Sequence, residues 1–351
     1  MRREERTTLK DVATHVGVSI STVSRVVRGD RSRPVEVSVE GRILEAVRTL
    51  GYRPNLVARA LVGGGDGPIT PAREVGVILG ARSYKYSDPF FSRVIEGIDA
   101  EIMAGRRHIR FIYSLSDLDD DGLFGEMVRP DVVGGLIGIA LGAGVLARLK
   151  ETGVAPIVVV EGPEPVRDVD FVSCDKEGAM AALMEHLWGL GHRHVAYLGA
   201  PGEERARRVR AWLALADAPP PVLLDTHEGW DMEAGYAATR RALVAGDIGC
   251  AGAPTAIVAG CDALAVGALR AAREAGLVTP RDLALVGFDD TMGAFAHPPL
   301  TTVSVQREQL GRLAVRRLVE RQRHPEEPAV RIVEATELIV RESCGARSTV
   351  D

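Results

Sequence analysis

Residues 19–27 place hydroxyl side chains and one arginine on the same face of an expected helix. Val23, Val26 and Val27 recur at helical spacing and face inward. The outer face then carries Ile20, Ser21, Thr22, Ser24 and Arg25. An arginine donates two parallel hydrogen bonds to guanine, and an apolar side chain suits the methyl group of thymine. We therefore expect Ile20, Ser21 and Arg25 to read base edges, and Thr22 and Ser24 to cap the helix or contact phosphate.

The elements that hold this face are two short helices joined by a tight turn. Apolar residues line one side of the first helix, at Leu9, Val12, Ala13 and Val16. Gly17 suits the turn because glycine tolerates a positive φ. Ser19 caps the second helix and is also a candidate DNA contact. This layout is a helix-turn-helix, whose second helix enters the major groove of DNA. A helical hairpin inside a larger core is the alternative.

Two more helices are expected before residue 63. One fits residues 40–50, and a break at residues 51–55 follows it. Asn55 caps a last helix over residues 56–62 or contacts phosphate. This helix is too short to be stable alone, since isolated helices in water need about 12–15 residues. Something outside the segment must therefore stabilise it.

Two motifs stand out in this region. They are Ala13-x-x-x-Gly17-Val18-Ser19-x-x-Thr22-Val23-Ser24-Arg25 and Tyr52-Arg53-Pro54-Asn55-x-x-Ala58-x-x-Leu61. Both resemble the headpiece and hinge of the lactose/galactose-repressor (LacI/GalR) family, and the likeness extends over nearly the whole chain. The resemblance implies a homodimeric repressor on a pseudo-palindromic DNA operator, with a hinge helix that folds only on that DNA.

The resemblance also assigns roles within the hinge helix. Leu61 matches the leucine wedge that enters the minor groove, where unstacking is offset by the contacts of a bent duplex. Ala58 matches the small residue beside the wedge, and Arg59 is expected to reach phosphate or the groove wall. The alternative for Leu61 is an ordinary core position.

Charge is distributed unevenly along the chain, whose formal net charge is −5. Residues 1–62 hold 12 Lys and Arg against 7 Asp and Glu, a charge of +5, so the remainder carries −10. A small basic module on an acidic body suits DNA binding at one end only, with strong salt dependence.

After the Gly- and Pro-rich residues 63–73, short β-branched runs alternate with Ala- and Leu-rich helical patterns. This βαβ alternation predicts an α/β core of two doubly wound lobes with parallel sheets. The resemblance implies the periplasmic-binding-protein-like core of the repressor family. We therefore expect an all-α helix-turn-helix headpiece with its hinge over 1–62, a linker over 63–73 and an effector-binding and dimerisation core over 74–345. Its first lobe covers about 74–162 and 307–334, and its second about 163–306 and 335–345.

Ligands of such sheets bind in the crevice beyond the carboxyl ends of the strands. By resemblance, the candidate effector contacts are Phe90, Arg208, Trp230, Cys261, Asp289 and Arg307. In the family the matching positions supply a wall aromatic, an arginine donor, an indole and a carboxylate, which together suit a sugar. The alternatives are ordinary packing for Trp230, a surface charge for Arg208 and a helix cap for Asp289.

Two of these positions depart from the family pattern. Cys261 stands where an asparagine is common, and a thiol is a weak hydrogen-bond partner. Arg307 stands where an aromatic residue occurs in a family member. We therefore expect a more acidic ligand, such as a sugar acid or a sugar phosphate.

Two classes of function compete for this sequence. The first is a transcription regulator controlled by a small molecule, and the second is a small-molecule-binding protein or enzyme on the same two-lobed fold. The sequence has no P-loop or G-x-S-x-G motif, and its four cysteines are scattered, so no catalytic residue, metal or cofactor is expected. Without a secretory signal or a transmembrane run, the expected location is the cytoplasm, with no membrane partner.

Overall fold

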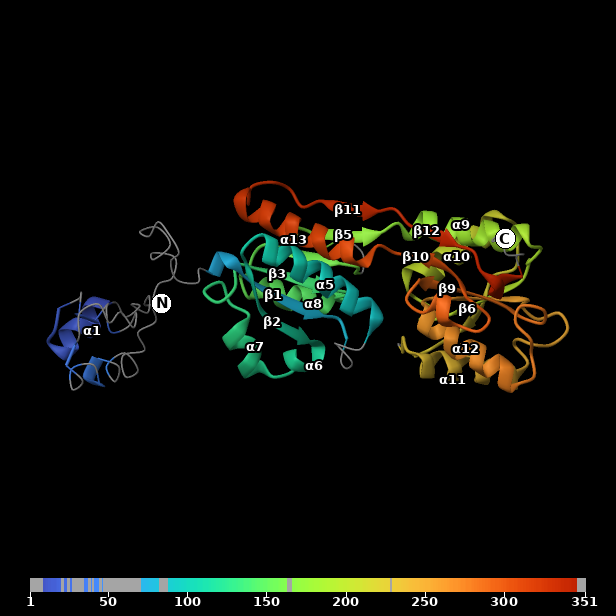
Figure 1. Ribbon diagram of the computed structural model, residues 1–351, viewed down its shortest axis with the longest axis horizontal. Coiled ribbons are helices and arrows are strands. Elements are labelled where there is room, and N and C mark those ends of the chain that lie inside the picture. The colour runs from blue at the N-terminus through green and yellow to red at the C-terminus, as the bar shows by residue number, and fades with distance from the viewer. Residues whose placement is uncertain are drawn as a thin grey trace, which may run out of the picture. The chain divides into compact units, whose positions relative to one another are not determined.

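The computed structural model describes residues 9–19, 22–23, 26, 35–36, 39, 41–43, 46, 71–81, 88–162, 166–227 and 229–345. The chain divides into two compact units, Met1–Pro71 and Ala72–Asp351 (Figure 1). Each unit has a hydrophobic core of its own.

The first unit contains the expected turn between helices. Helix α1 spans Leu9–Val16, and Gly17 follows it with a φ of 74°. The Gly17 N–H donates to the carbonyl of Ala13 at 2.9 Å. Ser19 Oγ accepts from the Thr22 N–H at 3.1 Å, which is the bond of a helix N-cap. The predictions of a turn at Gly17 and a cap at Ser19 are confirmed. The described part of the small core consists of Val12, Ala13, Val23, Ile43 and Ala46.

A sheet of six parallel strands forms the first lobe of the second unit, in the order β11-β5-β4-β3-β1-β2. A 3-10 turn, η1 (Pro71–Arg73), leads into it. The strands are β1 (Glu74–Leu79), β2 (His108–Ser114), β3 (Gly135–Ile139), β4 (Ile157–Val160), β5 (Asp170–Cys174) and β11 (Arg331–Glu334). The central strands are buried on both faces, as parallel sheets require.

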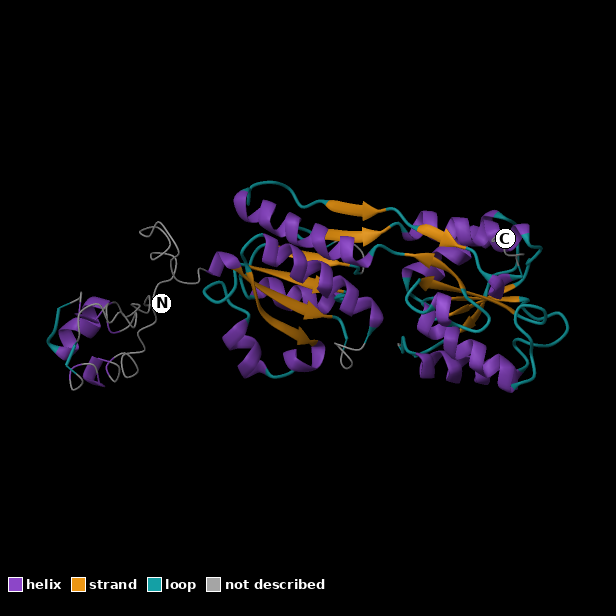
Figure 2. Cartoon of the chain, in the orientation of Figure 1, coloured by secondary structure: helices purple, strands orange, loops and turns teal. Residues whose placement is uncertain are grey.

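Helices cover both faces of this sheet (Figure 2). Helices α5 (Pro89–Ala104) and α13 (Arg307–Arg323) pack on one face. Helix α8 (Ala143–Glu151) and the short α6 (Leu115–Leu118) pack on the other, beside α7 (Asp121–Met127). Helices α5 and α13 cross closely, because a Cβ on Gly97 would lie 2.0 Å from the carbonyl oxygen of Glu308. This contact fixes the first turn of α13, which carries Arg307.

The second lobe has a sheet in the order β12-β10-β9-β8-β6-β7, in which β12 alone runs antiparallel to its neighbour. Its strands are β6 (Val195–Leu198), β7 (Val222–Leu224), β8 (Ala256–Ala259), β9 (Ala284–Asp289), β10 (Thr301–Ser304) and β12 (Glu337–Ile339). Its helices are α9 (Lys176–Gly189), α10 (Glu204–Leu215), α11 (Met232–Ala245) and α12 (Asp262–Glu274), with the 3-10 turns η2 (Gly293–Phe295) and η3 (Glu342–Cys344).

The chain passes between the two sheets three times, after β5, after β10 and after β11. The first crossing lies later than the boundary expected at about residue 162. Strand β5 pairs with β4 and β11, so residues 170–174 belong to the first lobe, and the second lobe begins with α9. The expected boundary was therefore too early.

Candidate functional site

Two of the residues expected to contact DNA fall in the described part of the first unit. Ser19 Oγ and Thr22 Oγ1 lie 2.8 Å apart at the start of the second helix. This geometry fits residues that position the helix. The other candidates, Ile20, Ser21, Ser24, Arg25, Asn55, Ala58, Arg59 and Leu61, lie outside the described residues and stay predictions.

In the second unit, left-handed backbone gathers at the carboxyl ends of the strands. Ala140 follows β3 with a φ of 54°, Glu161 follows β4 with 48°, and Asp289 ends β9 with 95°. Such conformations cost of order 1–3 kcal/mol for residues other than glycine and cluster at functional sites. Asp290, next to Asp289, also has a positive φ, of 48°, so three ionisable residues share this conformation at the strand ends: Glu161, Asp289 and Asp290.

Asp289 is the centre of a charged group at the junction of the lobes, which we call the interlobe site. Its residue is 8% exposed, and its side chain makes no hydrogen bond to another described residue. Burial raises the pKa of Asp289 to about 7, and Arg205 and Arg307 limit the rise. Near neutral pH the carboxyl therefore exchanges between an acid that donates and a carboxylate that accepts.

Arg205 on α10 is the buried cation beside Asp289. Its side chain is 15% exposed and pairs with Glu203, which is 3.2 Å away and also accepts from the Tyr197 hydroxyl. Burial alone would lower the Arg205 pKa, but Glu203 raises it well above its usual value. The guanidinium carbon lies 4.9 Å from the ring centroid of Trp230. Arg205 also donates to the carbonyl of Gly260, at the end of β8.

An ion pair between Glu161 and Lys176 connects the two lobes at this site. Glu161 follows β4 of the first lobe and also accepts from the Cys174 N–H at 2.6 Å. Lys176 begins α9 of the second lobe, and its Nζ lies 3.7 Å from Glu204. Burial alone would lower the Lys176 pKa, but the carboxylate of Glu161 raises it by more, so the net shift of the Lys176 pKa is upward.

Arg307 enters the site from the first turn of α13. One of its terminal nitrogens, Nη2, donates to the carbonyl of Asp290 over 3.4 Å, which is a long bond. The other, Nη1, is buried and has no hydrogen-bond partner among the described residues. The neighbouring Asp290 carboxylate is already paired with Arg341 at 2.8 Å.

Cys261 and Asp262 begin α12 and have different roles. The Cys261 thiol donates weakly to the carbonyl of Trp230 at 3.5 Å, and burial raises its pKa to about 12, so it is neutral. Asp262 is fully buried and accepts from Thr302 Oγ1 at 2.6 Å and from the Met292 N–H at 3.0 Å. Asp262 therefore connects the start of α12 to two other segments, the loop after β9 and strand β10.

The interlobe site thus brings together four of the six expected effector residues: Trp230, Cys261, Asp289 and Arg307. Arg208 lies one turn beyond Arg205 with its side chain 38% exposed, where it pairs with Glu177 at 2.8 Å and Glu204 at 3.4 Å. Phe90 is half-buried in the first turn of α5, edge-on to Phe91. The sequence analysis did not identify Arg205, Glu203, Glu161 or Lys176 as site residues. Three of them have a recognisable position: Glu161 directly follows strand β4, Lys176 begins helix α9 and Glu203 is the N-cap of helix α10.

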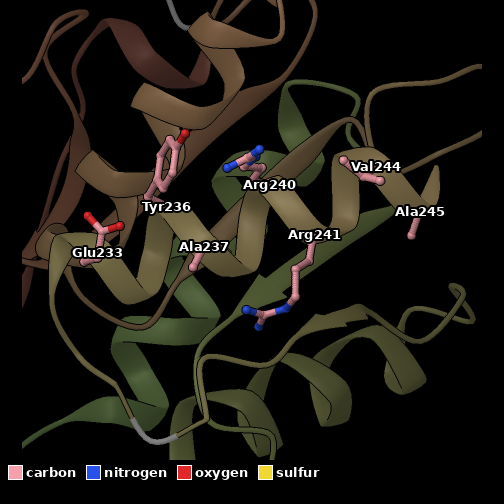
Figure 3. A pocket seen from close by; sticks show the side chains of 7 residues that line it. All are labelled: Glu233, Tyr236, Ala237, Arg240, Arg241, Val244 and Ala245. Atoms are coloured by element: carbon pink, nitrogen blue, oxygen red, sulfur yellow. The ribbon is translucent and has the colours of Figure 1, made fainter.

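A surface hollow of about 490 Å³ lies elsewhere, along α11 (Figure 3). It is lined by Glu233, Tyr236, Ala237, Arg240, Arg241, Val244 and Ala245, so none of the expected site residues lines it. Across the described ranges we find no cluster of metal-ligating side chains. Nor does any helix there have the length and apolar character needed to cross a membrane.

Known proteins with the same architecture place this chain in a family. Residues 8–55 match the model of bacterial regulatory proteins of the lacI family, and residues 184–344 match a periplasmic binding protein-like domain. The HTH-type transcriptional repressor MelR of Bacillus subtilis is 30% identical, with 96% of this chain and 97% of MelR covered. The HTH-type transcriptional regulator CelR of Thermobifida fusca is also 30% identical, with 98% and 100% covered.

Solved structures agree with these matches. A complex of transcriptional regulator CelR with cellobiose shares 27% identity over 96% of this chain and 100% of CelR, with a TM-score of 0.68. The lac repressor dimer bound to operator shares the fold, at 24% identity over 97% and 100% of the chains and a TM-score of 0.67. With a helix-turn-helix unit and a two-lobed core of parallel sheets, this chain belongs to the LacI family and is a DNA-binding transcriptional regulator rather than an enzyme.

Proposed function

We propose that the chain is a homodimeric repressor whose affinity for a pseudo-palindromic operator is controlled by a sugar or sugar derivative bound at the interlobe site. It acts in the cytoplasm, where it meets DNA. The observation that carries the proposal is Asp289, a buried carboxyl that has no hydrogen-bond partner among the described residues and lies beside Arg205 where the two lobes meet. A ligand hydroxyl supplies the partner that this carboxyl lacks.

Control of DNA binding follows from the position of the site between the lobes. The ion pair between Glu161 and Lys176 connects the first lobe to the second. A ligand that rearranges the groups around this pair therefore changes the orientation of one lobe relative to the other. Coupling of this kind is typically about 1–3 kcal/mol, and it is reciprocal between effector and operator. The cellobiose complex of CelR supports a saccharide as the ligand class.

The test begins with an operator selected from random-sequence DNA by the purified chain. Binding is expected to weaken steeply as salt rises, because phosphate contacts release counterions. A panel of sugars and sugar derivatives is then screened by thermal shift, and each hit is tested for its effect on operator affinity. A ligand at 100 times its Kd adds about 2.7 kcal/mol of stability, so binding is visible. Hits that leave operator affinity unchanged contradict the proposal.

Arg25→Ala is expected to weaken operator binding by about 1–3 kcal/mol and to relax the sequence preference at one position of each half-site. The reason is the loss of paired hydrogen bonds to a base edge. The measurement is titration of the selected operator and of unrelated DNA at one salt concentration. Equal loss on both DNAs would mean that Arg25 contacts phosphate and not a base.

A further inference from the structure

Among the described residues, three of the four cations that we name at the interlobe site have a carboxylate partner and one has none. Lys176 pairs with Glu161, Arg205 with Glu203, and Arg341 with Asp290. Arg307 makes no ion pair with any described carboxylate, and the hydrogen bond it makes is the 3.4 Å contact to the Asp290 carbonyl. A cation is thus held at the site without an acceptor for its buried Nη1.

An unpaired guanidinium of this kind requires an acceptor, because a buried charged donor without a partner is costly. A carboxylate fits the planar fork of arginine and accepts two parallel hydrogen bonds from it. Arg307 also lies in the first turn of α13, and the N-cap residue Gln306 makes no side-chain hydrogen bond there. The partial positive charge of a helix N-terminus favours an anion nearby.

The protonation of Asp289 limits how many negative charges a bound anion can carry. It lies within electrostatic reach of Arg205 from α10, Arg307 from α13, Asp262 from α12 and Glu161 from the end of β4. When Asp289 is protonated, Arg307 is the one cation of the site without a carboxylate partner among the described residues. When Asp289 is ionised, its carboxylate offsets the charge of Arg307 and repels an incoming anion. A ligand with two negative charges would also face the carboxylates of Glu161 and Glu203.

We propose that the effector is a sugar carrying a single carboxylate, an aldonic or uronic acid, whose carboxylate is bound by Arg307 while a hydroxyl bonds to Asp289. This inference rests on the proposed function, since it specifies the ligand of the same site. Binding takes up a proton at Asp289, because the incoming anion and Arg307 form a pair and Asp289 then loses its cationic neighbour.

The test uses the full chain and matched sets of hexose derivatives. Glucose, galactose and mannose are each supplied as the neutral sugar, the aldonate, the uronate and the 6-phosphate, and binding is measured by calorimetry. A carboxylated member is expected to bind at least about 10-fold more tightly than its neutral and phosphorylated counterparts, since a hydrogen bond to a charged group contributes about 10- to 100-fold. Arg307→Gln is expected to remove this advantage. Arg312→Gln, on the same helix but paired outside the site with Glu101, is expected to retain it.

The pH dependence gives a second readout. The carboxylate of a sugar acid is ionised from pH 6 to pH 8, so the change in affinity over this range reports on Asp289. Burial raises the Asp289 pKa to about 7, and affinity should therefore fall about 10-fold from pH 6 to pH 8. Asp289→Asn should remove this slope.

The outcomes separate this inference from the proposed function. Preference for the neutral sugar or the phosphate, or an unchanged preference in Arg307→Gln, overturns the inference and leaves effector control in place. Failure of every saccharide to bind or to change operator affinity overturns the proposed function itself.

Discussion

Arg205→Ala is expected to lower the free energy of unfolding of the second lobe by about 3–5 kcal/mol, the range found when one partner of a buried ion pair is removed. The variant leaves Glu203 in the interior with only the Tyr197 hydroxyl and the helix backbone as donors. It also removes the donor to the Gly260 carbonyl and the packing of the guanidinium on Trp230 and Phe288. We expect the response to effector to be lost as well, because Trp230 and Asp289 both lose a neighbour that holds them.

Intrinsic fluorescence is a suitable measurement for this variant. The chain has three tryptophans, Trp188, Trp212 and Trp230, and all lie in the second lobe. Urea unfolding at a fixed protein concentration therefore reports on the lobe that Arg205 stabilises.

Arg208→Ala is the matched control for Arg205→Ala. Its side chain is 38% exposed on the same helix, and the ion pair with Glu177 is worth at most about 1 kcal/mol. Equal losses in the two variants would contradict the roles given to them here. Full effector response in Arg205→Ala would exclude Arg205 from the interlobe site.

The fold could be predicted where the apolar pattern is strong. Strands such as β1, β3 and β4 are short β-branched runs buried on both faces, so their sequence alone predicts a parallel sheet. Strand β5 was not predicted, because its sequence, DFVSC, contains an aspartate and a serine and therefore lacks a continuous apolar run. In the structure all five of its residues are buried. Asp170 is stabilised there by arginines that lie 147 or more residues away in sequence, a distance that local patterns do not span.

The residues of the interlobe site could be predicted from the sequence only where they lie at the end of a recognisable strand. Asp289 ends a buried strand, a position where ligand contacts are expected in such sheets. The choice between Arg205 and Arg208 depends on helical phase. Glu203 caps α10 and pairs with Arg205, so Arg205 turns inward and Arg208 turns toward Glu177. The ion pair between Glu161 and Lys176 could not be predicted from the sequence. The expected lobe boundary lay before β5, so the segment that carries Lys176 was not recognised as the connection between the lobes.

Asp170→Asn is expected to lower the free energy of unfolding of the first lobe by about 3 kcal/mol or more. Asp170 is 1% exposed, and it accepts from Arg317 Nε and from the Val330 N–H, each at 2.8 Å. Arg321 Nε lies 3.0 Å from its second oxygen. The substitution keeps the size of the side chain but leaves two buried guanidiniums without their shared carboxylate. Because Arg317 keeps its pairs with Glu320 and Glu327, we expect a loss near the lower end of the 3–5 kcal/mol range.

Hydrogen exchange of the β5 and β11 amides measures this effect in the lobe concerned, since Asp170 joins both strands to α13. Tryptophan fluorescence provides the comparison, because it reports on the second lobe and should change less. Asp121→Asn is the matched control: its side chain is 92% exposed, and its bond to Arg148 at 2.6 Å is worth at most about 1 kcal/mol. A loss in Asp170→Asn no larger than in this control would mean that the arginines find other acceptors. A loss confined to β5 and β11 would instead show that the first lobe can unfold without the second, although one buried apolar cluster contains residues of both lobes.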